Sequence, residues 1–274
     1  MYRTLIEKLI ERVLRVKGSA VVIGLLSGLI GTGLGGLITA VHPRPGKRLL
    51  AALLGFAGGI MMAMVAFDLL PAAIRTSGGP MSLLAFGLGN LFLSRFRRLR
   101  RRGRARRPGR SSHVWWPKRK RYLLPYDYAE TGLMVALGIA LHDTAEGLAI
   151  GAGYMVEADL GLRVAIIMTL HNIPEGIAIA GPLRIARVKA WKAIALPVLA
   201  SLPTGIGALI GVAAGTVSSG VLGFNLALAG GAMTTVAALD LLPDALALAE
   251  GPALAGTLAG ILAGLVLTQV GMPH

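Results

Sequence analysis

Long apolar runs recur along this chain and constrain its fold more than any other feature. Most are close to 20 residues long, the length that an α-helix needs to cross the hydrocarbon core of a bilayer. Backbone groups in a bilayer must be hydrogen-bonded within the chain, so such runs form helices. Only 15% of the 274 residues are charged, whereas soluble domains carry about 25%. The pattern predicts an all-α polytopic membrane protein.

Eight transmembrane helices are expected from the count of apolar runs. An amphipathic segment, 1–19, precedes the first, and its mixture of Leu and Ile with charged residues favours a helix at the membrane surface. The third span is the shortest. The expected spans cover residues 20–41, 49–71, 80–95, 130–154, 163–183, 191–213, 219–243 and 252–270.

Four short stretches recur at a spacing of 172 residues and predict an internal repeat. For example, the Phe-Asp-Leu-Leu-Pro that ends at Pro71 returns as Leu-Asp-Leu-Leu-Pro ending at Pro243. One such match could arise by chance between Gly-rich helices. Four matches at the same spacing favour an internal repeat. The helices of 20–95 (repeat A) would return as those of 191–270 (repeat B), with the middle pair, 130–183, between them. The copies start five spans apart, an odd number, so we expect a 3+1+1+3 inverted repeat, an arrangement typical of transporters.

Two similar polar motifs, 29 residues apart, interrupt the apolar runs of the middle pair. Residues four apart share one face of a helix. Each motif therefore points an imidazole and a carboxylate the same way, with another oxygen beside them. The members are His142, Asp143 and Glu146 in the first motif, and His171, Asn172 and Glu175 in the second.

Polar groups of this kind near the middle of a bilayer cost several kcal/mol unless they are partnered. A divalent metal shared by the two motifs accounts for both. Helix-bridging His–Glu hydrogen bonds and a metal-free proton relay are the alternatives. The chain has no cysteine, so the donors are nitrogen, oxygen or thioether, which suits Zn, Fe(II), Mn or Co. Carboxylates from facing helices can also bridge two ions, so a binuclear site is expected.

The second motif contains Pro174, which cannot donate to the carbonyl of Leu170 and is expected to kink its helix. The first motif has Ala145 at the matching position, so its helix is expected to be straighter. Gly147 and Gly176 follow the two glutamates. They either allow close approach of a neighbouring helix or reflect ordinary packing of small residues.

Three further residues are candidates for a transport path. Asp68 and Asp240 each stand near the end of an apolar span, before Leu-Leu-Pro. They are interpreted either as carboxylates at the headgroup boundary or as way stations on opposite sides, with Asp68 outside and Asp240 inside. Met61 offers a weak thioether ligand, although methionine more often fills a core.

The positive charge is concentrated in one loop, 96–129. Of 28 Lys and Arg residues, 14 lie between Arg95 and Arg121, and the net charge is +15. Positive loops stay in the cytoplasm, so both termini are expected outside the cell membrane. We interpret the loop as a topology signal that touches anionic lipid. It has little aromatic interleaving, so no nucleic-acid partner is expected.

The two motifs resemble those of the ZIP family of divalent-metal transporters, particularly its bacterial members. The segment Leu170-His171-Asn172-Ile173-Pro174-Glu175-Gly176 is similar to the family's full metal-binding motif. The stretch from His142 to Gly147 is similar to its counterpart, with Asp for the usual Asn and Ala for the usual Pro. Segments in the second and seventh spans, 55–59 and 240–243, are also similar to family patterns.

This resemblance implies eight spans, outside termini, a binuclear site on the middle pair, and metal import, often by a homodimer. It implies an elevator-like movement of spans 1, 4, 5 and 6 against the rest. Met61 would lie near the metal entry and Asp240 near the exit. Two departures stand out. Leu202 precedes Pro203 where some relatives carry Glu, which weakens the expected second metal site, and His113 is the single histidine in a loop that many members fill with histidines.

The sequence therefore predicts a multi-pass permease of the inner membrane that imports divalent metal by alternating access. Zinc is the first substrate expected, with Fe²⁺, Mn²⁺, Cd²⁺ and Co²⁺ as further ones, and with membrane lipid and a second copy of the chain as partners. An intramembrane di-metal enzyme and a metal sensor are the alternatives. The chain has no Gly-rich phosphate loop with Lys, so transport is not expected to use ATP directly.

Overall fold

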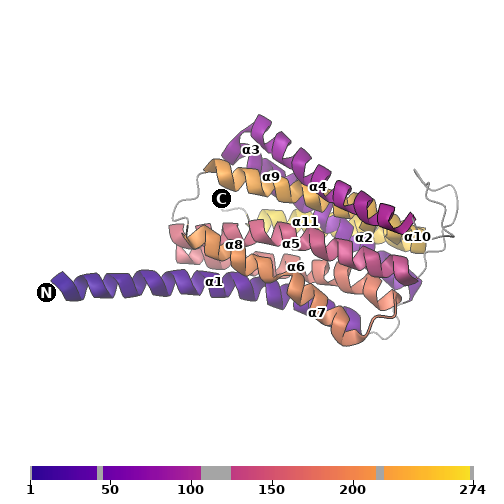
Figure 1. Ribbon diagram of the computed structural model, residues 1–274, viewed down its shortest axis with the longest axis horizontal. Helices are drawn as coiled ribbons and strands as arrows, with labels where there is room; N and C mark the ends of the chain where they lie inside the picture. The colour runs from indigo at the N-terminus through magenta and orange to yellow at the C-terminus, as the bar shows by residue number, and fades with distance from the viewer. Residues whose placement is uncertain (1, 42–45, 106–124, 214–218, 272–274) are drawn as a thin grey trace.

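The computed structural model describes residues 2–41, 46–105, 125–213 and 219–271, and every regular element in these ranges is helical. Consecutive segments join into eight long helices (Figure 1), which confirms the all-α expectation. The segments are α1 (Tyr2–Val41), α2 (Lys47–Met64), η1 (Val65–Leu69), α3 (Leu70–Ser77), α4 (Gly79–Ala105), α5 (Pro125–Val156), α6 (Ala158–Ile185), α7 (Ala190–Ala200), α8 (Leu202–Ala213), α9 (Ser219–Val236), η2 (Ala237–Leu241), α10 (Leu242–Leu248) and α11 (Glu250–Gly271).

Seven of the helices in the described ranges are long and apolar enough to cross a membrane. The remaining one is α4, which contains the third expected span, 80–95. Its apolar stretch holds Asn90 and is followed by arginines from Arg95 onward. Asn90 is accommodated inside the bundle, because its Oδ1 accepts a hydrogen bond of 2.8 Å from Thr235 on α9.

Helices extend into both ends of the expected Arg-rich loop, 96–129, whose place in the cytoplasm stays a prediction. The helix α4 continues to Ala105, because Arg is a good helix former and the helix need not end where its apolar residues end. At the other end α5 begins at Pro125, a residue favoured in the first turn. The rest of the loop, including His113, lies outside the described residues. The segment 1–19 belongs mostly to the continuous helix α1, and its place at the membrane surface stays a prediction.

The helices form two groups that lie side by side (Figure 1). The first group contains α1, α5, α6 and the α7–α8 helix. The second group contains the α2–α3 helix, α4, the α9–α10 helix and α11. The two groups meet mainly where α5 faces α9 and where α6 faces α2. Both polar motifs therefore belong to the first group and lie close to its boundary with the second.

Inside each group, glycines let helix backbones touch. A Cβ atom at Gly35 of α1 would overlap the carbonyl oxygen of Ile173 on α6, and one at Gly59 of α2 would overlap that of Thr257 on α11. Between the groups the glycines meet side chains instead. Gly138 faces Val236, and Gly181 faces Leu50. Each group is thus held by close backbone packing of the kind that small residues allow in lipid, whereas side chains fill the boundary.

Two short π-helical turns occur at the 172-residue spacing of the predicted repeat. They are η1 and η2, and they contain Asp68 and Asp240. Each turn precedes a proline, Pro71 or Pro243, whose ring would clash with the carbonyl four residues earlier in a regular α-helix. A π turn widens the helix and removes that clash. The local structure is repeated, while the inverted arrangement of the two copies stays a prediction.

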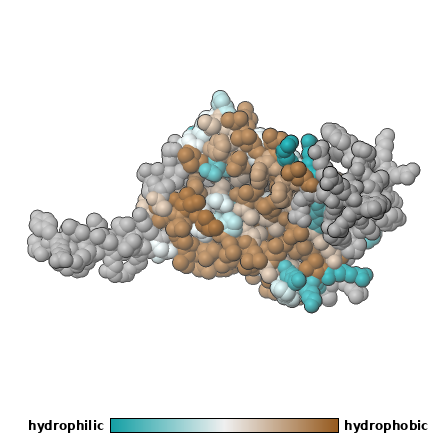
Figure 2. All heavy atoms as spheres, in the orientation of Figure 1, coloured by the Kyte–Doolittle hydropathy of each residue, from teal (hydrophilic) through white to brown (hydrophobic). Residues whose placement is uncertain are grey.

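The visible face of the described residues is mostly hydrophobic, and strongly hydrophilic residues gather mainly toward the right-hand end of the view (Figure 2). Among the exposed side chains are Leu83 of α4, Leu209 of α8 and Leu262 of α11. Apolar side chains so exposed are stable when lipid surrounds them. The surface therefore fits the multi-pass membrane class that the apolar runs predict.

Replacement of Gly35 by Ala should lower the free energy of unfolding by about 1–3 kcal/mol, because the new methyl group overlaps the backbone of α6. Circular dichroism during titration with denaturing detergent measures the change. Gly87→Ala in α4 is the control, because a Cβ there meets no atom within 4 Å. Equal stability of the two variants would contradict backbone packing at Gly35.

Candidate metal site

All six residues of the two motifs lie in the middle of α5 and α6, and all six side chains are buried. His142, His171 and Glu175 have no exposed surface, and Glu146 is 3% exposed. The i, i+4 spacing places each histidine and glutamate on one helical face, as expected. Since α5 and α6 pack against each other, these two faces meet. The structure therefore brings the two motifs into one cluster.

The histidines and glutamates of the cluster converge on one another. His142 Nε2 lies 2.7 Å from Oε1 of Glu175, a contact that connects α5 to α6. His171 Nε2 lies 3.1 Å from the same oxygen. Oε1 of Glu146 lies 3.5 Å from Nε2 of each histidine. The two rings are edge to face, with centroids 5.8 Å apart. Donor atoms of this spacing can share one ion.

Among the described residues, most polar atoms of the cluster have no hydrogen-bond partner. Buried polar atoms in proteins are nearly always paired, and each unpaired one costs about 1–3 kcal/mol. Such a concentration in one place favours a common partner. The unpaired atoms are His142 Nδ1, Asp143 Oδ1, both carboxylate oxygens of Glu146, both ring nitrogens of His171, both amide atoms of Asn172 and Oε2 of Glu175.

Two overlapping sets of three side chains can hold a metal ion, and in each set the ligand atoms lie within 4.8 Å of one another. The first set is His142, His171 and Glu175. The second is His142, Asp143 and Glu146. Imidazole and carboxylate donors without thiolate suit zinc and other first-row divalent ions. His142 belongs to both sets, so the two positions adjoin each other.

Glycines bring two further helices against the cluster. A Cβ at Gly147 would overlap the carbonyl oxygen of Thr204 on α8, and one at Gly176 would overlap that of Thr32 on α1. This favours close helix approach over ordinary packing as the role of both glycines. The helix α6 continues through Pro174 to Ile185, and the kink at Pro174 stays a prediction.

Thr204 is a site residue that sequence reasoning missed. Its hydroxyl donates a hydrogen bond of 3.2 Å to Oδ2 of Asp143, and both side chains are buried. It orients the carboxylate, because only Oδ1 is then left without a partner. A polar residue buried one position after Pro203 was the available signal. Leu202, which raised doubt about the second metal site, is 41% exposed, so that position faces away from the cluster.

The three candidate path residues lie outside both ligand sets. Met61 is buried in the apolar core of α2. Asp68 is half-buried, with no hydrogen-bond or ion-pair partner in the described part of the chain. Asp240 is paired with Arg97 of α4, whose Nη2 lies 2.6 Å from Oδ1, and Arg97 also donates to the carbonyl of Leu239. The carboxylate of Asp240 is therefore bound to a cation of the protein itself.

A helical bundle with seven apolar spans and a buried histidine–carboxylate cluster defines a multi-pass membrane protein with a candidate metal site. Comparison with known proteins agrees. The ZIP zinc transporter family matches residues 117–270, more than half of the chain, and the chain belongs to this family. The family's name describes zinc transporters, which argues against the intramembrane enzyme alternative.

Curated relatives include two bacterial proteins named zinc transporter ZupT. The one from Salmonella arizonae is 33% identical over 129 residues, which are 47% of this chain and 47% of the relative. The one from Shigella flexneri is 31% identical over 122 residues, 43% of this chain and 44% of the relative. The match thus spans about half the length of these relatives.

Replacement of Thr204 by Val should weaken zinc binding about 10- to 100-fold, the usual effect of removing a residue that orients a metal ligand. The hydrogen bond to Asp143 is lost while the side-chain volume is kept. Equilibrium dialysis with purified protein measures the change. Thr204→Ser keeps the hydroxyl and should bind as the unchanged protein does. If Val and Ser variants bind zinc equally well, Thr204 does not orient Asp143.

Proposed function

We propose that the protein is a zinc permease of the inner membrane that carries Zn²⁺ into the cytoplasm through the six residues on α5 and α6. The observation that carries this proposal is the set of unpaired polar atoms at mid-helix. Their burial is costly, and a divalent ion is a partner that satisfies imidazole and carboxylate together. The names of the relatives support zinc as the substrate.

Charge balance supports binding of one or two ions. Asp143, Glu146 and Glu175 together bring a charge of −3 when the imidazoles are neutral. One divalent ion reduces this to −1, and two ions bring it to +1. Both values cost less than −3 in a low-dielectric interior. The two ligand sets that share His142 support a binuclear site, with Asp143 and Glu146 at the second position.

Other roles for the cluster account for fewer of its atoms. Helix bridging uses the His142–Glu175 hydrogen bond but leaves the side chains of Glu146, Asn172 and His171 without a hydrogen bond among the described residues. A metal-free proton relay leaves the same atoms without a partner. A metal sensor would use the same ligands without net transport, so it is separated from a permease by flux alone. Fe²⁺, Mn²⁺, Cd²⁺ and Co²⁺ fit the same donors and are proposed as further substrates.

Alternating access is proposed to occur by movement of the first group against the second. Backbone contacts at glycines hold each group together, whereas side chains fill the boundary between them. A boundary of apolar side chains can slide without breaking backbone packing. The site lies on the moving group, close to that boundary. The extracellular position of both termini, the homodimer, and the roles of Met61, Asp68 and Asp240 in the path are part of the same proposal.

Replacement of Glu175 by Ala should reduce zinc uptake into proteoliposomes more than about tenfold. Mutation of residues that only hydrogen-bond to metal ligands already lowers affinity or activity by about this factor, and Glu175 is itself a proposed ligand. The measurement is zinc flux, read with an enclosed indicator. Glu157→Gln removes a carboxylate that is exposed between α5 and α6, and it should leave the flux unchanged. Uptake by the unaltered protein no faster than by Glu175→Ala would refute the permease.

A disulfide between the two groups should stop transport if one group moves against the other. Gly138→Cys with Val236→Cys is suitable, because a Cβ at Gly138 lies 3.6 Å from that of Val236, within the range of about 3.5–4.5 Å seen in disulfides. The chain has no other cysteine. Zinc flux should fall on oxidation and return on reduction.

The matched control for this cross-link joins two helices of the second group. A Cβ at Gly58 of α2 lies 3.5 Å from that of Leu241 in η2, so Gly58→Cys with Leu241→Cys gives a disulfide of similar geometry. This pair should not block flux when oxidised. Full activity of the oxidised Gly138–Val236 pair would rule out relative movement at that point of the boundary.

A further inference from the structure

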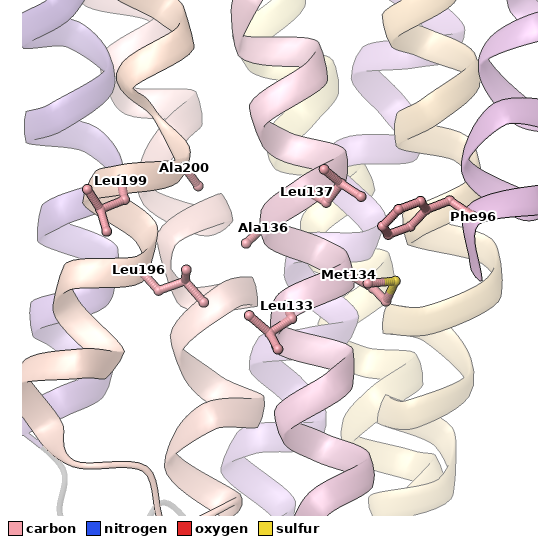
Figure 3. Close-up of a pocket in the computed structure, with 8 residues that line it drawn as sticks. All are labelled: Phe96, Leu133, Met134, Ala136, Leu137, Leu196, Leu199 and Ala200. Carbon is pink, nitrogen blue, oxygen red and sulfur yellow. The ribbon is translucent and has the colours of Figure 1, made fainter. Parts of the chain in front are cut away.

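An apolar groove opens on the outer surface of the bundle, at the boundary between the two groups. Its volume is about 320 Å³, and residues of α4, α5 and α7 line it (Figure 3). The lining includes Phe96 of α4, Leu133 and Leu137 of α5, and Leu196 and Leu199 of α7. The volume is at the lower end of the range of about 300–1,000 Å³ found for ligand pockets. None of the six cluster residues lines it, so it is a separate feature.

The surroundings of the groove indicate a lipid chain as its occupant. Two of the helices that line it, α5 and α7, belong to apolar spans. All of its lining residues are apolar. Leu133 and Leu199 are 40% and 58% exposed, so the groove is open to whatever surrounds the helices. In a membrane, that medium consists of lipid acyl chains. An empty groove would lose dispersion contacts, so an acyl chain is expected to fill it.

A cationic side chain, Lys192, stands at one end of the groove. It lies four residues before Leu196 on α7, so it occupies the same helical face about one turn nearer the helix start. Lys192 is exposed, and in the described part of the chain it is not paired with a carboxylate.

Trp191 marks the headgroup level beside this charge. It is 62% exposed, and Nζ of Lys192 lies 5.4 Å from the centroid of its ring. Exposed tryptophans are typical of the membrane–water interface. An ammonium group at that level, with an apolar groove directly above it, matches a phospholipid with a negative headgroup and an acyl chain.

We propose that an anionic phospholipid binds this groove, with its acyl chain between α4, α5 and α7 and its phosphate at Lys192. The site is formed by both groups, because α4 belongs to the second and α5 and α7 to the first. A bound lipid therefore bridges the boundary that moves in the proposed transport cycle. Binding itself does not depend on zinc transport.

Quenching of Trp191 fluorescence by brominated lipid tests the proposal. Trp115→Phe and Trp116→Phe leave Trp191 as the single tryptophan of the three in this 274-residue chain. This protein is placed in phosphatidylcholine bilayers that contain a minor fraction of brominated phosphatidylglycerol or, in parallel, brominated phosphatidylcholine. Phosphatidylglycerol should quench more strongly at the same fraction, because it is enriched at the groove.

Two further changes separate the headgroup from the chain. Lys192→Gln should lower the enrichment of phosphatidylglycerol about fivefold, the factor that one cation contributes at an anionic surface. Leu199→Phe places a larger ring at the exposed rim of the groove and should reduce quenching by displacing the chain. Arg163→Gln removes one charge from the exposed start of α6, at the opposite end of the bundle, and should change nothing.

Several outcomes overturn the proposal. Equal quenching by the two brominated lipids, as expected if a second copy of the chain or any neutral lipid covers the groove, excludes selective binding. If Arg163→Gln and Lys192→Gln lower the phosphatidylglycerol enrichment equally, the enrichment depends only on the net charge of the protein and not on this groove. Unchanged quenching in Leu199→Phe excludes the groove as the site. Because the readout needs no metal, it stands or falls separately from zinc flux.

Discussion

The rest of the structure depends on the free-energy cost of burying polar side chains at the middle of two helices. Six polar side chains are buried between α5 and α6, and one short hydrogen bond between the motifs, from His142 to Glu175, satisfies few of their atoms. In a bilayer no water is at hand to pair them. In the proposed function a divalent ion pairs with several of these donors at once, and packing around the cluster keeps the side chains together.

That packing comes from backbones more than from side chains. Glycines at the crossings of α1 with α6 and of α5 with α8 leave no room for a side chain, so four helices surround the cluster at close range. Hydrophobic burial contributes little between helices in lipid, where the surroundings are equally apolar. Close contact and the hydrogen bond from Thr204 to Asp143 hold the site instead. The ligands belong to one compact group of helices.

The second group meets the first through side chains, and this difference gives the molecule a natural boundary. The cluster lies beside it, and so does the groove between α4, α5 and α7. Asp240 near the predicted exit belongs to the second group, where it pairs with Arg97. A path that ends there has to open this ion pair or pass beside it. The candidate metal site and the proposed lipid groove thus both lie near the place where the two groups adjoin.

The sequence alone was enough for the helical membrane class, the two motifs and all six cluster residues, because these depend on run length and on i, i+4 spacing, which are local properties. The repeated Asp-Leu-Leu-Pro coincides with the two π turns, although no π turn is predicted from the sequence. Helix ends were predicted less well. The arginines after Arg95 look like a loop by polarity, yet they continue α4 because helix propensity does not require apolar residues.

Tertiary structure decided what lies next to what. No local pattern shows that Thr204, 61 residues from Asp143, bonds to it, or that Leu202 faces outward while Thr204 faces in. The pairing of Arg97 with Asp240 and the groove between three separate helices likewise arise only when the two groups assemble. Spacing determines which side chains share a helical face, and packing of whole helices determines which faces meet.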